Sequence, residues 1–307
     1  PPVFYLLYAR KKYGIDKKVP ANTKLIAQRW DAFGHQLANF INNNTDIIVA
    51  TVFLGVREVS VYAVYSMISS NIRKIVNSVS SGTTAAFGNM IARNEDSILK
   101  KRFEQYELLT FLVCYILFTS AAVLFIPFVA IYTKGITDAN YIRYGLAVCF
   151  CTAEFFACVK LVYENVVFAA GKFKQTKKTA YAEAAINIIA SIILVQFIGL
   201  SGILIGTICA GVFRTLAYNM YASKNIVHRS SWRILPKIIY VVICVAISAY
   251  IAWLLPVAKV NTIGAWLVCA FFVTICFTII GVTFSYLFFK DDTKALFNMV
   301  VGILKRK

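Results

Sequence analysis

The sequence is poor in charged residues, and above all in acidic ones. Only 15% of its 307 residues are charged, and 14 Asp and Glu stand against 32 Lys and Arg. Soluble domains carry about 25% charged residues, whereas here 59% of the residues are hydrophobic and the mean hydropathy is +0.69. These values exclude disordered and ordinary soluble classes and predict a membrane protein.

Histidine is almost absent, and cysteine occurs only inside apolar segments. The two histidines, His35 and His228, lie far apart, and the eight cysteines fall where thiols act as small apolar packing groups. This pattern predicts no metal-ligand cluster, disulfide framework or cofactor. The nearest approach to a catalytic pair is His35 beside Asp31, which we interpret as part of a cavity wall or cytoplasmic gate. We therefore expect no catalytic residues and no enzyme.

Eight apolar runs are long enough to cross a bilayer as helices. A spanning helix needs about 20 mostly apolar residues, and these runs are too continuously apolar for barrel strands. We expect an all-α, polytopic membrane helix bundle of about eight transmembrane helices. Their approximate ranges are 30–54, 59–82, 106–132, 141–169, 179–199, 201–222, 236–257 and 262–289.

The chain begins with a short apolar segment, residues 1–9, without an initiating Met. It is too short to span a bilayer, and basic residues follow it, whereas in a signal peptide they come first. We expect residues 1–29 to be the end of a truncated preceding helix and a cytoplasmic basic linker.

Basic residues alternate between the two sides of the predicted bundle. If residues 10–29 are cytoplasmic, 24 of the 32 Lys and Arg fall on that side, only Arg57, Lys134, Arg143 and Lys259 fall on the other, and four lie within spans. Cytoplasmic loops of membrane proteins carry such an excess. We therefore expect both ends of the chain to be cytoplasmic, and the net charge of +18 to record orientation rather than a nucleic-acid partner.

Polar side chains recur at helical spacing in the first two spans. The first stripe comprises Asp31, His35, Asn39, Asn42 and Asp46, and the second comprises Tyr62, Ser66, Ser70, Arg73, Asn77, Ser80 and Thr84. Steps of three and four place each set on one helix face. Such stripes either join helices by hydrogen bonds or line a water-accessible pathway. Charged groups at membrane depth, Asp46, Arg73 and Lys74, favour the pathway.

Later spans hold further charged groups. Lys160 and Glu164 are four residues apart and are expected to pair on one helix face, while Glu154 points elsewhere. Glu183, Asn187 and Ser191 form another polar stripe in the fifth span. Because Glu183 is only a few residues from Lys178, a place at the membrane interface is the alternative. Arg214 lies near the middle of its span, too far from the end to reach water by snorkelling.

The last two spans are nearly free of charge. Between Ile238 and Phe289 the only formally charged side chain is Lys259, in the loop. These helices either face lipid or form an apolar groove for a hydrocarbon tail. Amphipathic helices along the membrane surface are expected around residues 93–104 and 293–307.

The junction of the first two spans resembles a known family. Asn42-Asn43-Asn44-Thr45-Asp46-Ile47-Ile48-Val49, followed by Phe53-Leu54-Gly55 and Val59-Ser60-Val61-Tyr62, is similar to the helix-turn-helix that opens the second half of Wzx-type polysaccharide flippases. These belong to the multidrug, oligosaccharidyl-lipid and polysaccharide exporter superfamily. The resemblance implies two six-helix lobes that work by alternating access. Residues 30–222 would be the second lobe, and residues 223–307 would hold two additional helices and a basic tail.

The resemblance also implies a function, namely translocation of a polyprenyl-diphosphate-linked oligosaccharide, a polysaccharide precursor, across the bacterial cytoplasmic membrane. Membrane lipids and glycan polymerisation machinery would be its partners. Arg and Lys can hold a diphosphate, and Asn and Asp can bind sugar hydroxyls. The candidate substrate-pathway residues are Asn39, Asn42, Asp46, Arg73, Lys74, Asn77 and Arg214. Asp46 or Glu154 would couple transport to H⁺ or Na⁺.

Two alternatives stay open at this point. A drug or organic-cation exporter of the same superfamily would favour a cavity dominated by carboxylates, whereas the charges within the spans are balanced. The basic members are Arg73, Lys74, Lys160 and Arg214, and the acidic members are Asp46, Glu154, Glu164 and Glu183. A membrane-embedded enzyme would need a catalytic constellation, and the sequence offers only the Asp31 and His35 pair.

Overall fold

The computed structural model describes residues 2–14, 29–80, 82–254 and 260–304, and within these ranges it contains helices and no strand. Eight long helices coincide with the eight predicted runs. They are α2 (Arg29–Leu54), α3 (Val56–Ser80), α5 (Asp96–Tyr132), α6 (Tyr144–Ala169), α7 (Phe173–Ile198), α8 (Leu200–Asn225), α9 (Leu235–Leu254) and α10 (Ile263–Phe288). The predicted all-α polytopic bundle is confirmed.

Four shorter helices complete the described chain: α1 (Pro2–Tyr13), α4 (Thr83–Ala92), the 3₁₀ helix η2 (Ser231–Ile234) and α11 (Lys290–Leu304). By length and composition, α5 to α8, η2 with α9, and α10 are apolar enough to cross a membrane. Helices α2 and α3 are similar in length, with 26 and 25 residues, but they carry the two polar stripes. The predicted basic stretches at residues 17–18 and 305–307, and Lys259, lie outside the described residues.

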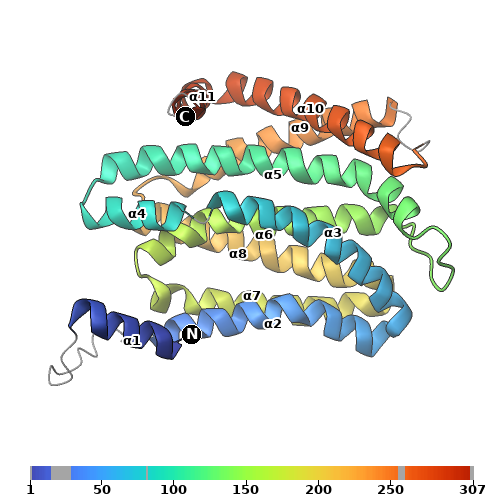
Figure 1. The fold of residues 1–307 in the computed structure, drawn as a ribbon, viewed down its shortest axis with the longest axis horizontal. Helices are drawn as coiled ribbons and strands as arrows, with labels where there is room; N and C mark the ends of the chain where they lie inside the picture. The colour runs from blue at the N-terminus through green and yellow to red at the C-terminus, as the bar shows by residue number, and fades with distance from the viewer. Residues whose placement is uncertain (1, 15–28, 81, 255–259, 305–307) are drawn as a thin grey trace.

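The long helices run back and forth along the longest axis of the molecule, which is horizontal in Figure 1. Helix α2 packs on α7, α7 on α8, α8 on α6 and α6 on α5, while α9 and α10 cover the other side of α5. The short helix α4 marks one end of the bundle, called here the α4 end. The starts of α2, α5, α7 and α9 lie there, so the basic segments that the sequence places on one side do gather at one end.

Two glycines make the tight turns at the opposite end. Gly55 joins α2 to α3 with φ +83°, and Gly199 joins α7 to α8 with φ +58°, a backbone region that favours glycine. Beyond the second turn, a Cβ on Gly202 would overlap the backbone of Leu194, and a Cβ on Gly206 would overlap Ser191. These glycines let α7 and α8 pack closely over their whole length, which brings the polar residues of α7 next to those of α8.

Helix α5 differs from its prediction. It starts at Asp96, ten residues earlier than expected, and runs for 37 residues, about 56 Å at 1.5 Å per residue. The expected surface helix around residues 93–104 is therefore wrong in its second half, because Leu99 and Phe103 are buried and Phe103 packs against Phe87 of α4. The expected C-terminal amphipathic helix is present as α11.

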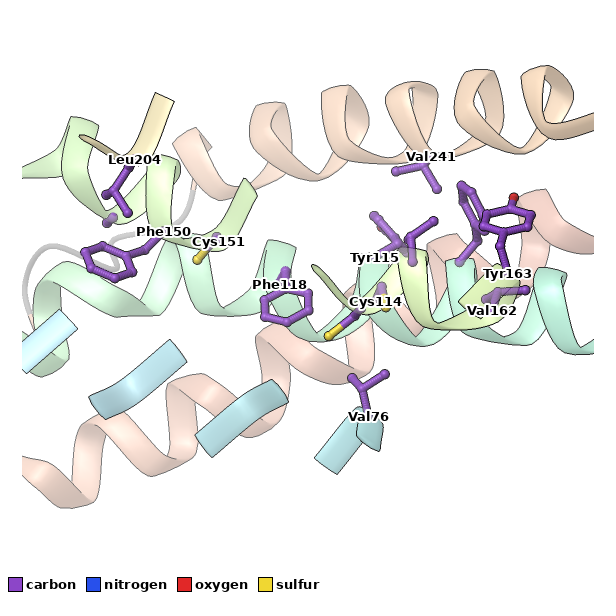
Figure 2. Packing of buried hydrophobic residues seen from close by; sticks show 14 of the residues in the cluster. Val76, Cys114, Tyr115, Phe118, Phe150, Cys151, Val162, Tyr163, Leu204 and Val241 are labelled. Atoms are coloured by element: carbon purple, nitrogen blue, oxygen red, sulfur yellow. The ribbon is translucent and has the colours of Figure 1, made fainter. Parts of the chain in front are cut away.

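Helix α5 is the centre of the apolar core. Figure 2 shows Cys114, Tyr115 and Phe118 of α5 lying between Val76 of α3 and Val241 of α9. Among the cysteines, Cys114, Cys151, Cys158 and Cys244 are buried, as expected of apolar packing groups, whereas Cys209 is exposed. The core joins the six helices α2, α3 and α5–α8 to α9 and α10.

Candidate functional site

A polar cavity of about 110 Å³ lies where α2, α3, α6 and α8 meet. Its lining residues are Asn42, Asn43, Asp46, Tyr62, Ser66, Arg73, Phe150, Ala153, Glu154, Ala157, Lys160, Leu204 and Thr207. The cavity brings together Asn42, Asp46 and Arg73 from the predicted substrate pathway and Glu154 from the predicted coupling pair. The first two polar stripes thus meet at a hollow space between helices.

Asp46 is held in this cavity by hydroxyl groups. The Oγ1 atom of Thr207 lies 2.9 and 3.0 Å from the two carboxylate oxygens of Asp46, and the Tyr62 hydroxyl donates to Oδ2 at 3.3 Å. Asn187 of α7 donates to Thr207 at 3.0 Å, and its own buried Oδ1 has no hydrogen-bond partner in the described part of the chain. Asp46, Thr207 and Asn187 therefore form a group of buried oxygens. Sequence reasoning missed Thr207, which is an ordinary helix residue until α7 and α8 pack.

Arg73 and Glu154 face each other across the cavity. The Nε of Arg73 lies 3.3 Å from Oε2 of Glu154, with the side chains 34% and 13% exposed. From the sequence, Arg73 is expected to bind the substrate's head group, and Glu154 is expected to couple transport to an ion. The structure joins them in one ion pair between α3 and α6.

The remaining predicted pathway residues lie outside the cavity wall. Asn39 is half-buried, whereas Lys74 and Asn77 are exposed, and Lys74 donates to Asn71 at 3.0 Å. Within the cavity, the buried Oδ1 of Asn42 has no hydrogen-bond partner among the described residues. The α2 and α3 stripes therefore divide into a buried part at the cavity and an exposed part beside it.

A second charged cluster is buried between α6, α7 and α8. Arg214 is fully buried and contacts Glu183, the hydroxyl of Tyr218 and, at 3.8 Å, Glu164. Lys160 donates to Glu183 at 2.9 Å. The expected pairing of Lys160 with Glu164 is therefore wrong, because each reaches a partner on a neighbouring helix. Glu183 is 1% exposed and faces the bundle interior together with Asn187 and Ser191, the stripe that the sequence offers for α7.

His35 connects α2 to this second cluster. Its Nδ1 lies 3.3 Å from the Tyr218 hydroxyl, and its Nε2 lies 2.9 Å from the carbonyl oxygen of Phe173. Asp31 forms an ion pair with Lys177 of α7 at 2.9 Å. The two residues thus attach α2 to α7 and α8 near the α4 end.

A third cluster, at the α4 end, escaped the sequence analysis. Glu107 of α5 is fully buried and accepts hydrogen bonds from Arg229 at 2.6 and 2.7 Å and from Tyr163 at 2.6 Å, and Lys237 lies at 2.8 Å. Burial alone would lower the pKa of Arg229, but the hydrogen bonds to Glu107 and the negative charges around Arg229 together outweigh burial and raise that pKa. In the sequence, Arg229 and Lys237 belong to the basic residues that predict the orientation in the membrane, and they have no other expected role. A lone Glu inside an apolar run was the available signal.

An ion pair of a different kind closes the opposite end. Arg143, just before α6, binds both carboxylate oxygens of Glu58 at 2.6 and 2.7 Å, and both side chains are 28% exposed. The hydrogen bonds to Glu58 raise the pKa of Arg143. Neither residue lines the cavity, and the pair is a two-pronged, partly exposed salt bridge.

Comparison with known proteins agrees with the fold. No protein family matches the sequence, and no curated protein does so either. In three dimensions the chain is similar to a MOP superfamily transporter from Pyrococcus furiosus Vc1 (DSM3638), whose binding pocket is described as having reverse polarity that suggests a different function. The TM-score is 0.55 at 14% sequence identity.

That similarity extends over most of this chain. It covers 83% of the 307 residues, and the chain spans 61% of the length of the transporter. The likeness shows that this chain shares its helical fold with that transporter.

Proposed function

We propose that the protein translocates a polyprenyl-diphosphate-linked oligosaccharide across the cytoplasmic membrane by alternating access. The observation that carries this proposal is the position of Arg73, a guanidinium that is 34% exposed in a polar cavity between helices. Arg binds phosphate oxygens through several donors at once. An anionic group inside the membrane therefore finds a natural partner there.

The neighbouring polar residues suit the rest of such a substrate. Asn42 and Asn43 line the cavity, and Asn39, Lys74 and Asn77 lie on the same two helices. Amide side chains can donate to and accept from sugar hydroxyls. We assign the diphosphate to Arg73, with Lys74 beside it in the sequence, and the glycan to the Asn residues of α2 and α3.

Arg214 takes a different place in this proposal. It was a candidate for the head group, but it is fully buried and already bound to Glu183, Glu164 and Tyr218. Removing one partner from such a buried ion pair costs about 3–5 kcal/mol. We assign Arg214 to holding α6, α7 and α8 together behind the cavity, and leave substrate contact to Arg73.

Asp46 is the better of the two candidates for ion coupling. Glu154 is compensated by Arg73, whereas hydroxyl groups surround Asp46 and the orphaned Oδ1 of Asn187 lies next to its partner Thr207. A buried carboxylate without a cation favours binding of H⁺ or a small cation. We propose that Asp46 supplies the coupling site of the transport cycle.

Orientation completes the proposal. The α4 end holds the basic segments, and the excess of Lys and Arg favours its placement in the cytoplasm. The chain would then start and finish on the cytoplasmic side. Residues 30–222 would act as the second lobe of the exporter, with 223–307 as additional helices and a basic tail.

The test is a flipping assay in proteoliposomes. The substrate is a fluorescent short-chain polyprenyl diphosphate that carries a disaccharide, and its movement is read by chemical quenching of the outer leaflet. Arg73→Gln is expected to slow flipping by at least tenfold, since a hydrogen bond to a charged group is worth about 1.5–3 kcal/mol. The matched control is Arg57→Gln, an exposed residue of α3 outside the cavity.

The same assay separates the alternative, a drug or organic-cation exporter. The carboxylates of Asp46 and Glu154 in the cavity wall favour that function. In that case the wild-type protein would move a fluorescent organic cation, and Arg73→Gln would leave or increase that movement. Failure of the wild-type protein to flip the diphosphate while it moves the cation would overturn the proposal.

A further inference from the structure

We propose that Glu154 is an internal counter-ion that occupies Arg73 in place of the substrate's anionic group, and that the substrate binds by displacing it. The inference rests on the proposed function and concerns the regulation of the same site. It makes the Arg73 and Glu154 ion pair an exchangeable contact rather than a structural one.

The geometry of the pair is suited to exchange. The contact between Arg73 and Glu154 joins Nε to Oε2 at 3.3 Å, and Oε2 accepts no hydrogen bond within the described residues. By contrast, Arg143 with Glu58 and Arg229 with Glu107 form two parallel hydrogen bonds of 2.6 to 2.7 Å. Two-pronged pairs are the stronger and more rigid kind. Arg73 therefore retains donors that Glu154 does not use.

Burial separates the two partners further. The Arg73 side chain is 34% exposed, so its free donors can be reached, whereas that of Glu154 is 13% exposed. The buried Oε2 of Glu154 makes no hydrogen bond within the described residues. Glu154 is thus held mainly by charge attraction. A stronger anion competes with it without having to break a hydrogen-bond network.

Charge balance explains why exchange is favoured over simple addition. The cavity wall carries two cations, Arg73 and Lys160, and two anions, Asp46 and Glu154. An unpaired charge at membrane depth costs several kcal/mol. With Glu154 on Arg73 this pair is neutral, and a diphosphate that replaces Glu154 keeps Arg73 paired at every stage.

The displaced carboxylate has a second partner within the same cavity. Lys160 lines the wall and is bound to Glu183 at 2.9 Å. Glu183 is also bound to Arg214, so it stays compensated when Lys160 is shared. Glu154 can therefore turn from Arg73 toward Lys160 when the anion arrives.

The size of the cavity limits what enters it. A volume of about 110 Å³ holds a few water molecules, each of which needs about 10–15 Å³ on this measure. That is room for a phosphate group and too little for an oligosaccharide. The exchange inside the cavity therefore concerns the anionic group alone, and the glycan extends from the cavity along the Asn residues of α2 and α3.

The inference predicts an unusual result for a removal of charge. Glu154→Gln keeps the side-chain size and removes the competitor, so the affinity for a diphosphate is expected to rise by about tenfold or more. The probes are farnesyl diphosphate and uncharged farnesol, with binding measured by calorimetry on the purified full chain in nanodiscs. The matched control is Glu58→Gln, the same substitution in a salt bridge outside the cavity.

Further variants test whether the gain in diphosphate affinity depends on Arg73. Arg73→Gln and the double variant Arg73→Gln with Glu154→Gln are both expected to lose farnesyl diphosphate binding, because the acceptor of the exchange is gone. Farnesol affinity is expected to be equal in all variants. If Glu154→Gln does not yield folded protein, Glu154→Asp shortens the side chain and is expected to tighten diphosphate binding in the same direction by a smaller factor.

The outcomes distinguish the inference from the proposed function. Wild-type binding of farnesyl diphosphate that depends on Arg73 but is unchanged or weakened by Glu154→Gln overturns the exchange and leaves the proposed function standing. Absence of diphosphate binding in every folded variant overturns both. An equal gain in Glu58→Gln shows a general effect of net charge and also overturns the exchange.

Discussion

Glu107 of α5 accepts two parallel hydrogen bonds from the guanidinium of Arg229, although both side chains are completely removed from solvent. Lys237 of α9 adds a third contact to the same carboxylate at 2.8 Å. One acidic residue thereby attaches both the segment after α8 and the start of α9 to α5. The additional helix pair is bound to the six-helix unit by charge as well as by apolar packing, so the two parts should move together.

Loss of the Glu107 carboxylate should therefore destabilise the fold. Glu107→Gln leaves Arg229 and Lys237 buried without their counter-ion, and removal of one partner of a buried pair costs about 3–5 kcal/mol. The expected result is a clear fall in the thermal unfolding midpoint of the purified protein in detergent. Glu58→Gln is the matched control, because its salt bridge is partly exposed and should be worth about 1 kcal/mol or less. Equal midpoints for the two variants would contradict the role given to Glu107.

The two arginines that the sequence analysis treated alike should separate in experiment. Arg214→Gln is expected to lower thermal stability strongly, since Glu183 and Glu164 lose a fully buried partner. Arg73→Gln is expected to lower stability less, because its side chain is 34% exposed and Glu154 can turn toward Lys160 in the same cavity. It is expected to lose transport, because the donors for the anionic group are gone. Unfolding midpoints and flipping rates of both variants, measured on the same preparations, check this. A stable but inactive Arg214→Gln would return Arg214 to the substrate pathway.

The contrast between these arginines shows how far sequence reasoning reaches. The length of the apolar runs predicted all eight long helices, because a run of about 20 apolar residues has few other stable conformations in a membrane. Helical periodicity placed Asp46 and Arg73 on polar faces, and both line the cavity. These features depend on which residues follow one another within a single helix, and a single sequence gives that information directly.

Pairing between helices could not be predicted in the same way. Lys160 and Glu164 are spaced as an ideal pair within one helix, yet each binds a residue on another helix, Glu183 or Arg214. Which residues meet depends on how closely α7 and α8 approach, and this approach is set by glycines such as Gly202. Thr207 belongs to the same class, because only the packed helices bring its hydroxyl to Asp46.

Cysteine reactivity should distinguish a wet pathway from hydrogen bonds that merely join helices. In a background without native cysteines, Asn43→Cys is expected to react rapidly with a water-soluble thiol reagent, because Asn43 is exposed and lines the polar cavity. Ile193→Cys on α7 is the control. Ile193 is also exposed, at 51%, but it lies on an apolar surface away from the cavity. Labelling rates in intact membranes are the measurement. Similar slow rates at both positions would favour the view that the stripes only join helices.

Replacement of Asp46 should separate ion coupling from substrate binding. Asp46→Asn keeps the size of the side chain and its contacts with the Thr207 and Tyr62 hydroxyls, but the neutral amide can neither take up a proton nor balance a cation. Flipping in proteoliposomes should then no longer respond to an imposed H⁺ or Na⁺ gradient, while binding of farnesyl diphosphate through Arg73 persists. Asp31→Asn is the matched control, because Asp31 lies on the same helix and pairs with Lys177 outside the cavity. If Asp46→Asn retains the gradient response and Glu154→Gln loses it, the coupling site belongs to Glu154, and the exchange of Glu154 for substrate would then also carry the ion.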